Sequence, residues 1–316
     1  MDADCVKECQ APNWPEHKPV CKDTQLEMRL EHIATLVKSL YLASRQETYD
    51  AHTTKILEND RELVLYDNDN PISKKAGWFV DFPHHLAKTA EIRDAATCYL
   101  VCQDALALFH DIIAQMLTGL NLKIEEVELQ VKNPRPIKII FSGRAVPQYN
   151  TSYSHYILRL TSPTGKMWAI DSTGAQYGIH KAFWNWLEYS QKNIQTMKDI
   201  LPFGRNRLFQ KAISKFNGVG GLVYAISWDA MIPAEAAIKS WEKESGHTLS
   251  KLIASSDPEF TTQKEILVDA VRQAVKNFVD TADYTKRVQK AHRYDMLNPG
   301  ENARKTAEAK RLYLTP

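Results

Sequence analysis

Apolar residues recur at helical spacing in the first part of the chain. Between positions 26 and 40 they follow one another at intervals of three and four residues, which places them on one face of a helix: Leu26, Leu30, Ile33, Val37 and Leu40. Asp23 or Thr24 comes just before this run and is a suitable helix cap. We expect the helix to reach about Asn59, and we expect segment 67–76 to be a loop, because its Asp-Asn-Asp-Asn-Pro sequence is typical of turns.

The middle of the chain predicts a helix followed by strands. Asp94 to Thr97 can cap a helix that starts near Cys98, runs to about Leu117 and ends at Gly119. Alternating or short apolar runs then predict strands at 127–131, 137–141, 156–160 and 167–170. The turn residues at 162–165 predict that the last two strands form an antiparallel hairpin. Segment 183–194 has an amphipathic helical pattern.

Only helical patterns follow Arg205, interrupted by glycines at 218–221 and by Pro233 and Pro258. Residues 299–316 are polar and basic, and we expect a frayed helix or tail there. The sequence thus predicts an α+β protein with a small N-terminal finger remnant, a long helix, a mixed helix and antiparallel-sheet core, and a helical C-terminal region. The expected divisions are 1–22, a helical linker at 23–66, the core at 77–200, a helical region at 201–298 packed on the core, and the tail.

Composition narrows the class of protein. The chain has 316 residues, and its formal net charge of +2 gives no broad positive field for nucleic acid. No apolar stretch approaches the roughly 20 residues that a membrane-spanning helix needs, and the N-terminus has no signal-peptide pattern. We therefore expect a cytoplasmic or nuclear protein without nucleic-acid or membrane partners. The five cysteines are odd in number and clustered, which argues against a disulfide framework.

Four potential metal ligands lie close together at the N-terminus. They form two pairs with the same four-residue spacing, so on helical backbone each pair projects from one face: Cys5 with Cys9, and His17 with Cys21. Thiolates and imidazole are the ligands of tetrahedral structural zinc. The pattern predicts a Zn²⁺ site; the alternative is a polar tail with coincidental cysteines.

Residues 5–22 resemble the C-terminal half of a MYND-type zinc finger. The similarity includes Glu8-Cys9-Gln10, Asn13-Trp14-Pro15-Glu16-His17-Lys18 and Val20-Cys21-Lys22. The resemblance implies a zinc-binding module that docks a short peptide motif of a partner protein. Such fingers bind two zinc ions through eight ligands, and the first four ligands, two Cys-x2-Cys pairs, are absent from this sequence. Either the four ligands regroup around one zinc, a partner or upstream residues supply the others, or the segment is metal-free.

A second candidate constellation is spread over the α/β segment. Cys98 is expected at the start of a helix, His155 at the start of a strand and Asp171 at the end of the next strand. A helix N-terminus favours thiolate, a nearby histidine can take the thiol proton, and a carboxylate can hold the imidazole tautomer. Because only the first helical turn has unpaired N–H groups, we expect Cys98 rather than Cys102 to be the nucleophile.

This order is similar to that of the papain-like and transglutaminase-like superfamilies of cysteine proteases, deamidases and acyltransferases. The resemblance covers roughly residues 94–178 and implies catalysis by Cys98, His155 and Asp171. The competing interpretation is that Cys98 and Cys102 are buried thiols on an apolar helix face, because free cysteine is among the most buried residue types.

Two functional hypotheses follow from these motifs. The favoured one is a zinc-binding, MYND-type interaction or regulatory protein whose large domain has unknown activity. The alternative is a cysteine hydrolase, deamidase or acyltransferase. Residues 168–178 also resemble proteins of filamentous fungi that carry a MYND finger before an uncharacterised domain. The distance between the Cys98 sulfur and the His155 ring is the observation that discriminates the two hypotheses.

Overall fold

The chain folds into an α+β protein, as the sequence predicts. The computed structural model describes residues 14–59, 62–68, 75–141, 148–149 and 154–315. Its helices are α1 (Trp14–Glu47), α2 (Ala90–Thr97), α3 (Cys102–Leu108), α4 (His110–Leu117), α5 (Trp186–Asn193), α6 (Arg205–Ile213), α7 (Val219–Ser245), α8 (Leu249–Leu252), α9 (Asp257–Thr281), α10 (Thr285–Leu297) and α11 (Glu301–Tyr313), with a 3-10 turn η3 (Gly174–Tyr177). Its strands are β1 (Thr53–Glu58), β2 (Leu63–Asp67), β3 (Lys123–Val131), β4 (Ile137–Phe141), β5 (Gln148–Tyr149), β6 (Ser154–Thr161), β7 (Met167–Ile170), β8 (Phe183–Asn185) and β9 (Ile194–Pro202).

A five-stranded antiparallel sheet carries the residues of interest, in the order β8-β7-β6-β3-β9. The predicted hairpin between β6 and β7 is confirmed, with Leu158 opposite Ile170 and Thr161 opposite Met167. Its turn is closed by the Ser162 amide, which donates to the Lys166 carbonyl at 2.9 Å. Gly165 in this turn has a φ of +83°, a conformation that glycine adopts without steric cost.

A second sheet has four strands in the order β1-β2-β4-β5. Its central pair, β2 and β4, is parallel, with Leu63 opposite Ile137 and Phe141 opposite Asp67. The sequence predicts β4 but neither β1 nor β2, because segment 53–66 was expected to lie in the helix and linker. The helix α1 ends earlier, at Glu47, where the Arg45 guanidinium donates to the Thr48 carbonyl at 2.6 Å.

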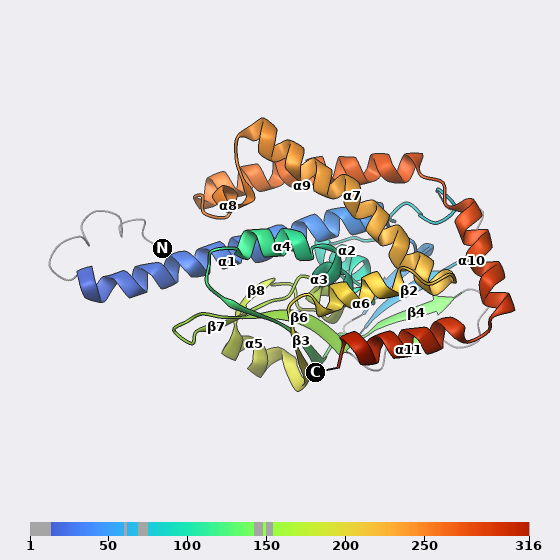
Figure 1. The fold of residues 1–316 in the computed structure, drawn as a ribbon, viewed down its shortest axis with the longest axis horizontal. Coiled ribbons are helices and arrows are strands. Elements are labelled where there is room, and N and C mark those ends of the chain that lie inside the picture. Colours follow the sequence, from blue (N-terminus) through green and yellow to red (C-terminus); the bar gives the residue numbers. More distant parts are fainter. Residues whose placement is uncertain (1–13, 60–61, 69–74, 142–147, 150–153, 316) are drawn as a thin grey trace.

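The helices lie in layers around the five-stranded sheet (Figure 1). The helix α1 runs between the sheet and the layer formed by α7 and α9, while α5 lies on the opposite side of the sheet. Side chains of β6 point alternately to the two faces of the sheet. Leu158 and Leu160 pack into the large core beneath α1, whereas Ile157 packs with Tyr189 of α5. The helix α1 is therefore a central core element and not a linker.

Three helix boundaries differ from those predicted. First, α1 begins at Trp14, and Asp23 pairs with Lys166 at 2.9 Å instead of capping a helix. Second, the expected helix at 98–117 is split into α3 and α4, and α2 ends where it was expected to begin. Third, segment 183–185 is strand β8, because the Asn185 side chain accepts from the amides of Leu187 and Glu188 and so starts α5 only at Trp186.

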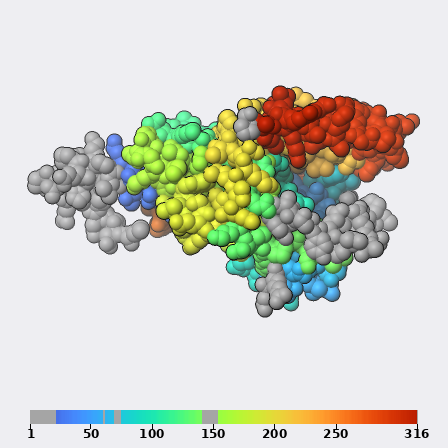
Figure 2. All heavy atoms as spheres, turned by 90° about the horizontal axis from the view of Figure 1, so that it is seen from below, coloured from blue at the N-terminus to red at the C-terminus, as the bar shows by residue number. Residues whose placement is uncertain are grey.

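The C-terminal segment is an ordered helix, so the expectation of a frayed tail is wrong. Ala309 of α11 and Leu314 beside it pack against Phe209 and Ile213 of α6. Figure 2 shows the end of the chain in red as a ridge along one edge of the molecule. Among the described residues, no helix is both long enough and apolar enough to cross a membrane.

Candidate active site

A buried histidine–carboxylate pair lies at one end of the β6–β7 hairpin. His155 is the second residue of β6 and Asp171 directly follows β7, so the hairpin brings both to the same end of the sheet, as predicted. The His155 Nε2 atom lies 2.8 Å from Asp171 Oδ1, and both side chains are completely buried. The short hairpin turn therefore aligns two polar groups that are sixteen residues apart in the sequence.

The side chain of Asp171 accepts hydrogen bonds from several donors. Oδ1 also accepts from the Thr173 amide at 3.2 Å, and Oδ2 accepts from the hydroxyl of Tyr189 at 2.8 Å. Gly174 leaves room for this arrangement, because a Cβ there would overlap Asp171 Oδ2 and lie 2.8 Å from its Cγ. A buried carboxylate needs such donors to offset its loss of hydration.

The two nitrogens of His155 have different surroundings. Nε2 donates to Asp171, whereas Nδ1 is buried and makes no hydrogen bond with a described residue. Burial lowers the pKa of His155, but the Asp171 carboxylate and then the Cys102 thiol outweigh it and raise the pKa to about 10. With this raised pKa the ring is an imidazolium near neutral pH, protonated on both nitrogens, and Nδ1 carries a lone pair only when the ring loses that second proton.

Cys98 does not open a helix, so the expectation for its position is wrong. It caps the C-terminal end of α2, where its amide donates to the Asp94 carbonyl at 2.9 Å. The residue is 0% exposed and packs in the apolar core. Burial, followed by the Asp94 carboxylate, raises the pKa of the Cys98 thiol well above its usual range. These surroundings are those of an unreactive core thiol.

Cys102 occupies the position that the sequence analysis gave to Cys98. It is the first residue of α3, preceded by Val101, which provides no side-chain cap. Its thiol is partly exposed and donates to the Ser154 carbonyl, next to His155, at 3.9 Å. The Cys102 thiol is also among the groups that raise the pKa of His155. The structure thus brings Cys102, His155 and Asp171 together.

The turn before Cys102 is held by a residue from the Asp171 loop. The amide of Leu100 donates to Gln176 Oε1 at 3.1 Å, and Gln176 is 2% exposed. Leu100 has a φ of +58°, which is an uncommon conformation for a branched side chain. Gln176 Nε2 in turn donates to the Thr173 carbonyl at 3.2 Å. Gln176 therefore fixes the turn before the thiol relative to the loop that carries the carboxylate.

A small pocket of about 70 Å³ adjoins the first turn of α3. Val101 and Asp104 line it, together with apolar side chains of α1 and α7. Two of its lining groups, Ser44 Oγ and Arg45 Nε, are buried and make no hydrogen bond with a described residue. Burial raises the pKa of Asp104 to about 6, although Arg45 and a hydrogen bond from Gln210 lower it. The pocket combines an apolar wall with a few polar groups, but at about 70 Å³ it is far smaller than the roughly 300–1,000 Å³ of typical small-molecule sites.

The candidate zinc ligands lie mostly outside the described residues. Cys5 and Cys9 lie there, and only the backbone of His17 and Cys21 is described, within the first turns of α1. Among the described side chains, no group of three or more histidine, cysteine or acidic residues is arranged to hold a metal ion. The zinc site therefore stays a prediction.

Sequence reasoning missed the residues that support the pair. Tyr189 and Gln176 act through tertiary contacts and have no local motif. The sequence does contain a signal that favours Cys102 over Cys98 at the start of a helix. Thr89 is a good N-cap for an earlier helix, and its hydroxyl accepts from the Ile92 amide at 3.2 Å. A helix that starts at Ala90 and ends before Leu100 makes Cys102 the first cysteine of the next helix.

Comparisons with known proteins assign no family. No protein-family model, no curated protein and no solved structure matches this chain.

Proposed function

We propose that this protein is a thiol-dependent acyl-transfer enzyme, a hydrolase, deamidase or acyltransferase, with Cys102 as its nucleophile. The observation that carries the proposal is the buried His155–Asp171 pair beside Cys102, whose thiol donates to the carbonyl of Ser154, the residue directly before His155. The nucleophile differs from the one expected from sequence, whereas the histidine and the carboxylate are the same.

The residues suit a two-step reaction. The reacting form is a thiolate–imidazolium pair, in which the proton of the Cys102 thiol is held on Nδ1 of His155. The raised pKa of His155 favours this pair, and Asp171 stabilises the imidazolium through Nε2. The sulfur then attacks a substrate carbonyl carbon, and His155 returns the proton to the leaving amine, alcohol or thiol. The thioester on Cys102 is resolved by water or by an amine, whose proton passes to Nδ1. Backbone N–H groups at the start of α3 are the candidates for stabilising the oxyanion.

The proposal can be tested without knowing the substrate. The folded protein would be incubated with the activated ester p-nitrophenyl acetate, and each cysteine-containing peptide examined by mass spectrometry. We expect an acetyl group on Cys102, none on Cys102→Ser, and the same rate at Cys102 in the matched variant Cys98→Ser. His155→Ala should slow the reaction at least about 100-fold, the range for loss of a general base. If Cys102 stays unmodified in the folded protein, or if His155→Ala has no effect, the proposal is wrong.

The zinc-binding interaction protein remains a second candidate. It is supported by the helical backbone at positions 17 and 21, which places His17 and Cys21 one turn apart on the same face of α1. Elemental analysis of protein purified without chelator tests it. We expect bound zinc that is lost in Cys9→Ser, and a metal-free unmutated protein would remove the zinc site from consideration.

A further inference from the structure

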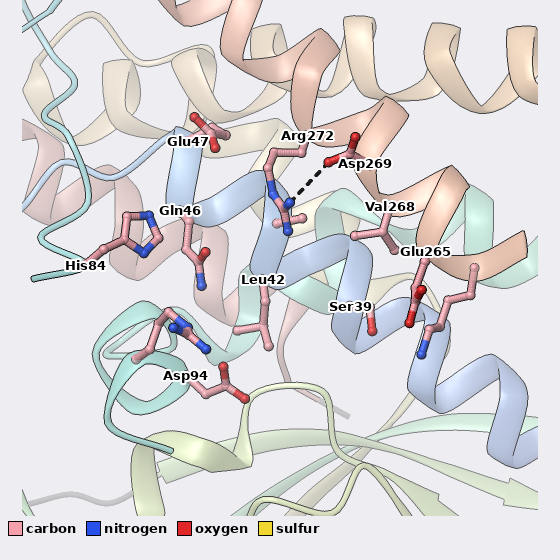
Figure 3. Close-up of a pocket in the computed structure, with 13 residues that line it drawn as sticks. Ser39, Leu42, Gln46, Glu47, His84, Asp94, Glu265, Val268, Asp269 and Arg272 are labelled. Atoms are coloured by element: carbon pink, nitrogen blue, oxygen red, sulfur yellow. Dashed lines mark hydrogen bonds and ion pairs between the residues drawn. The ribbon is translucent and has the colours of Figure 1, made fainter. Parts of the chain in front are cut away.

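A large cavity lies between helices α1, α2 and α9, and no residue of the Cys102 site lines it. Its volume is about 740 Å³, within the usual range for small-molecule sites. Leu42 and Ala43 of α1 and Val268 of α9 supply its apolar wall. Figure 3 shows Arg272 reaching from α9 toward α1, with His84 and Gln46 on one side of it and Glu265 on the other.

Basic groups from three separate segments converge at one end of this cavity. Arg93 comes from α2, Arg272 from α9 and His84 from the segment before α2. Burial lowers the pKa of His84, and the charges of Arg93 and Arg272, which line the same cavity, lower it further. Their mutual repulsion is unfavourable unless a negative charge lies between them.

The acidic residues of the cavity leave these groups largely unneutralised. The guanidinium of Arg93 makes no hydrogen bond or ion pair with a described residue, and only the Arg93 backbone is hydrogen-bonded, to Thr89 and Thr97. Asp94 pairs instead with Lys38 at 3.2 Å. Within the part of the chain that the structure describes, the ion pair of Arg272 is with Asp269 of its own helix, at 3.3 Å, and that carboxylate is 79% exposed, so the pair is weak.

Two further carboxylates belong to the cavity. Glu265 lies toward its other end, beyond Arg272 in Figure 3, and so does not occupy the basic corner. Glu47 lies nearer, and burial raises its pKa, although Lys276, Arg272 and Lys75 lower it. Lys75 and Lys276 also pair with Asp280, and the single carboxylate of Glu47 cannot neutralise both arginines. The corner made by Arg93, Arg272 and His84 therefore keeps an excess of hydrogen-bond donors.

We propose that this corner binds the phosphate group of a small organic phosphate, whose remaining atoms lie against Leu42, Ala43 and Val268. A phosphate dianion matches two guanidinium charges, and its three free oxygens can accept from Arg93, Arg272 and His84 together. A carboxylate offers one charge and two oxygens, so it satisfies this set less completely. The inference is independent of the acyl-transfer proposal, because it uses none of the same residues.

Binding of phenyl phosphate to the full chain tests the proposal, with inorganic phosphate and benzoate as comparison ligands at constant ionic strength. Isothermal titration calorimetry would measure the dissociation constants. We expect saturable binding of phenyl phosphate, tighter than that of inorganic phosphate because of the apolar wall, and tighter than that of benzoate. Arg93→Gln and Arg272→Gln should each weaken it at least tenfold, consistent with the loss of a charge-assisted hydrogen bond.

Matched control variants distinguish binding of phenyl phosphate at this cavity from a general effect of the protein's charge on anion binding. Arg304→Gln removes one positive charge and one ion pair, with Glu308, on α11, and should leave binding unchanged. Arg93→Lys keeps the charge but loses the planar fork, and should weaken binding less than Arg93→Gln does. Absence of saturable binding, equal effects of all three glutamine variants, or benzoate binding as tightly as phenyl phosphate would each overturn the proposal.

Discussion

The Asp171 carboxylate fits in its site because residue 174 is a glycine, which has no Cβ. A Cβ at this position would overlap the oxygen that Tyr189 contacts. We expect Gly174→Ala to displace the carboxylate, to destabilise the fold by roughly 1–3 kcal/mol and to slow acetylation of Cys102. Urea unfolding measures the loss of stability, and mass spectrometry measures the rate of Cys102 acetylation.

The matched control is Gly165→Ala, in the turn of the same hairpin. No atom lies within 4 Å of a Cβ there, so the substitution strains only the backbone, which has a φ of +83°. It should lower stability without changing acetylation. Equal acetylation rates in Gly174→Ala and the unmutated protein would contradict the importance of the contact.

The carboxyl group of Asp104 gives a pH-dependent prediction. Its pKa is raised from 3.8 to about 6, so the folded state binds its proton more tightly than the unfolded state does. Its contribution to stability is therefore greatest below about pH 4 and falls as the pH rises toward 6. Asp104→Asn keeps an oxygen that can accept from Gln210 and cannot ionise, so its stability relative to the unmutated protein should increase over this range by roughly 3 kcal/mol.

Urea unfolding at pH 4, 5, 6 and 7 measures this difference. Asp269→Asn, at a position 79% exposed on α9, reports the effect of removing one surface charge. A stability difference between Asp104→Asn and the unmutated protein that does not change with pH would contradict the prediction.

At the scale of residues, the sequence predicts the histidine–carboxylate pair but not which of the two cysteines lies beside it. His155 and Asp171 are joined by a local hairpin, so the strand pattern and turn chemistry were sufficient to place them. Cys98 and Cys102 are one turn apart in the expected helix, and the choice between them depended on one helix boundary. The carboxylate side of the site was thus predictable, whereas the thiol required the turn at Leu100, which Gln176 stabilises from a distant segment.

At the scale of elements, α11 shows how an apparently polar segment joins the core. Leu314 is 8% exposed and contacts the α6 cluster, whereas Leu312 is 66% exposed. We expect Leu314→Ala to lower the free energy of unfolding by about 2–3 kcal/mol, and Leu312→Ala to change it by no more than about 0.5 kcal/mol. Thermal unfolding of the two variants measures the difference, and equal midpoints would show that α11 does not contribute to the stability of the core.

Elements with a regular pattern were predicted better than those that depend on neighbours. The strands β4 and β7 have the predicted bounds, because each is a short apolar run next to turn residues. No strand is expected from the sequence at β9, whose residues are mostly exposed and do not alternate, and its pairing with β3 makes it a strand. The end of α1 at Glu47 depends on contacts of Arg45 with residues 48 and 50, which no periodicity reveals.

At the scale of the whole molecule, the candidate active site and the proposed phosphate site lie on different groups of elements. The first uses α3, β6 and the loop after β7, and the second uses α1, α2 and α9. The α+β class and the helical C-terminal half follow from sequence patterns. The packing of α9 against α1, which creates the large cavity, follows from no local pattern, and so the cavity could not be predicted.

The parallel pairing of β2 with β4 has a consequence for the order of folding. The helices α2 to α4 and strand β3 separate these two strands along the chain, so their contact forms only after a long loop has closed. The hairpin β6–β7 needs only its own turn, and local contacts form fast. In pulse-labelled hydrogen exchange during refolding, the amides of β6 and β7 should be protected before those of β2 and β4. The histidine and carboxylate would then meet early, while simultaneous protection of both sheets would indicate that the molecule folds in a single cooperative step.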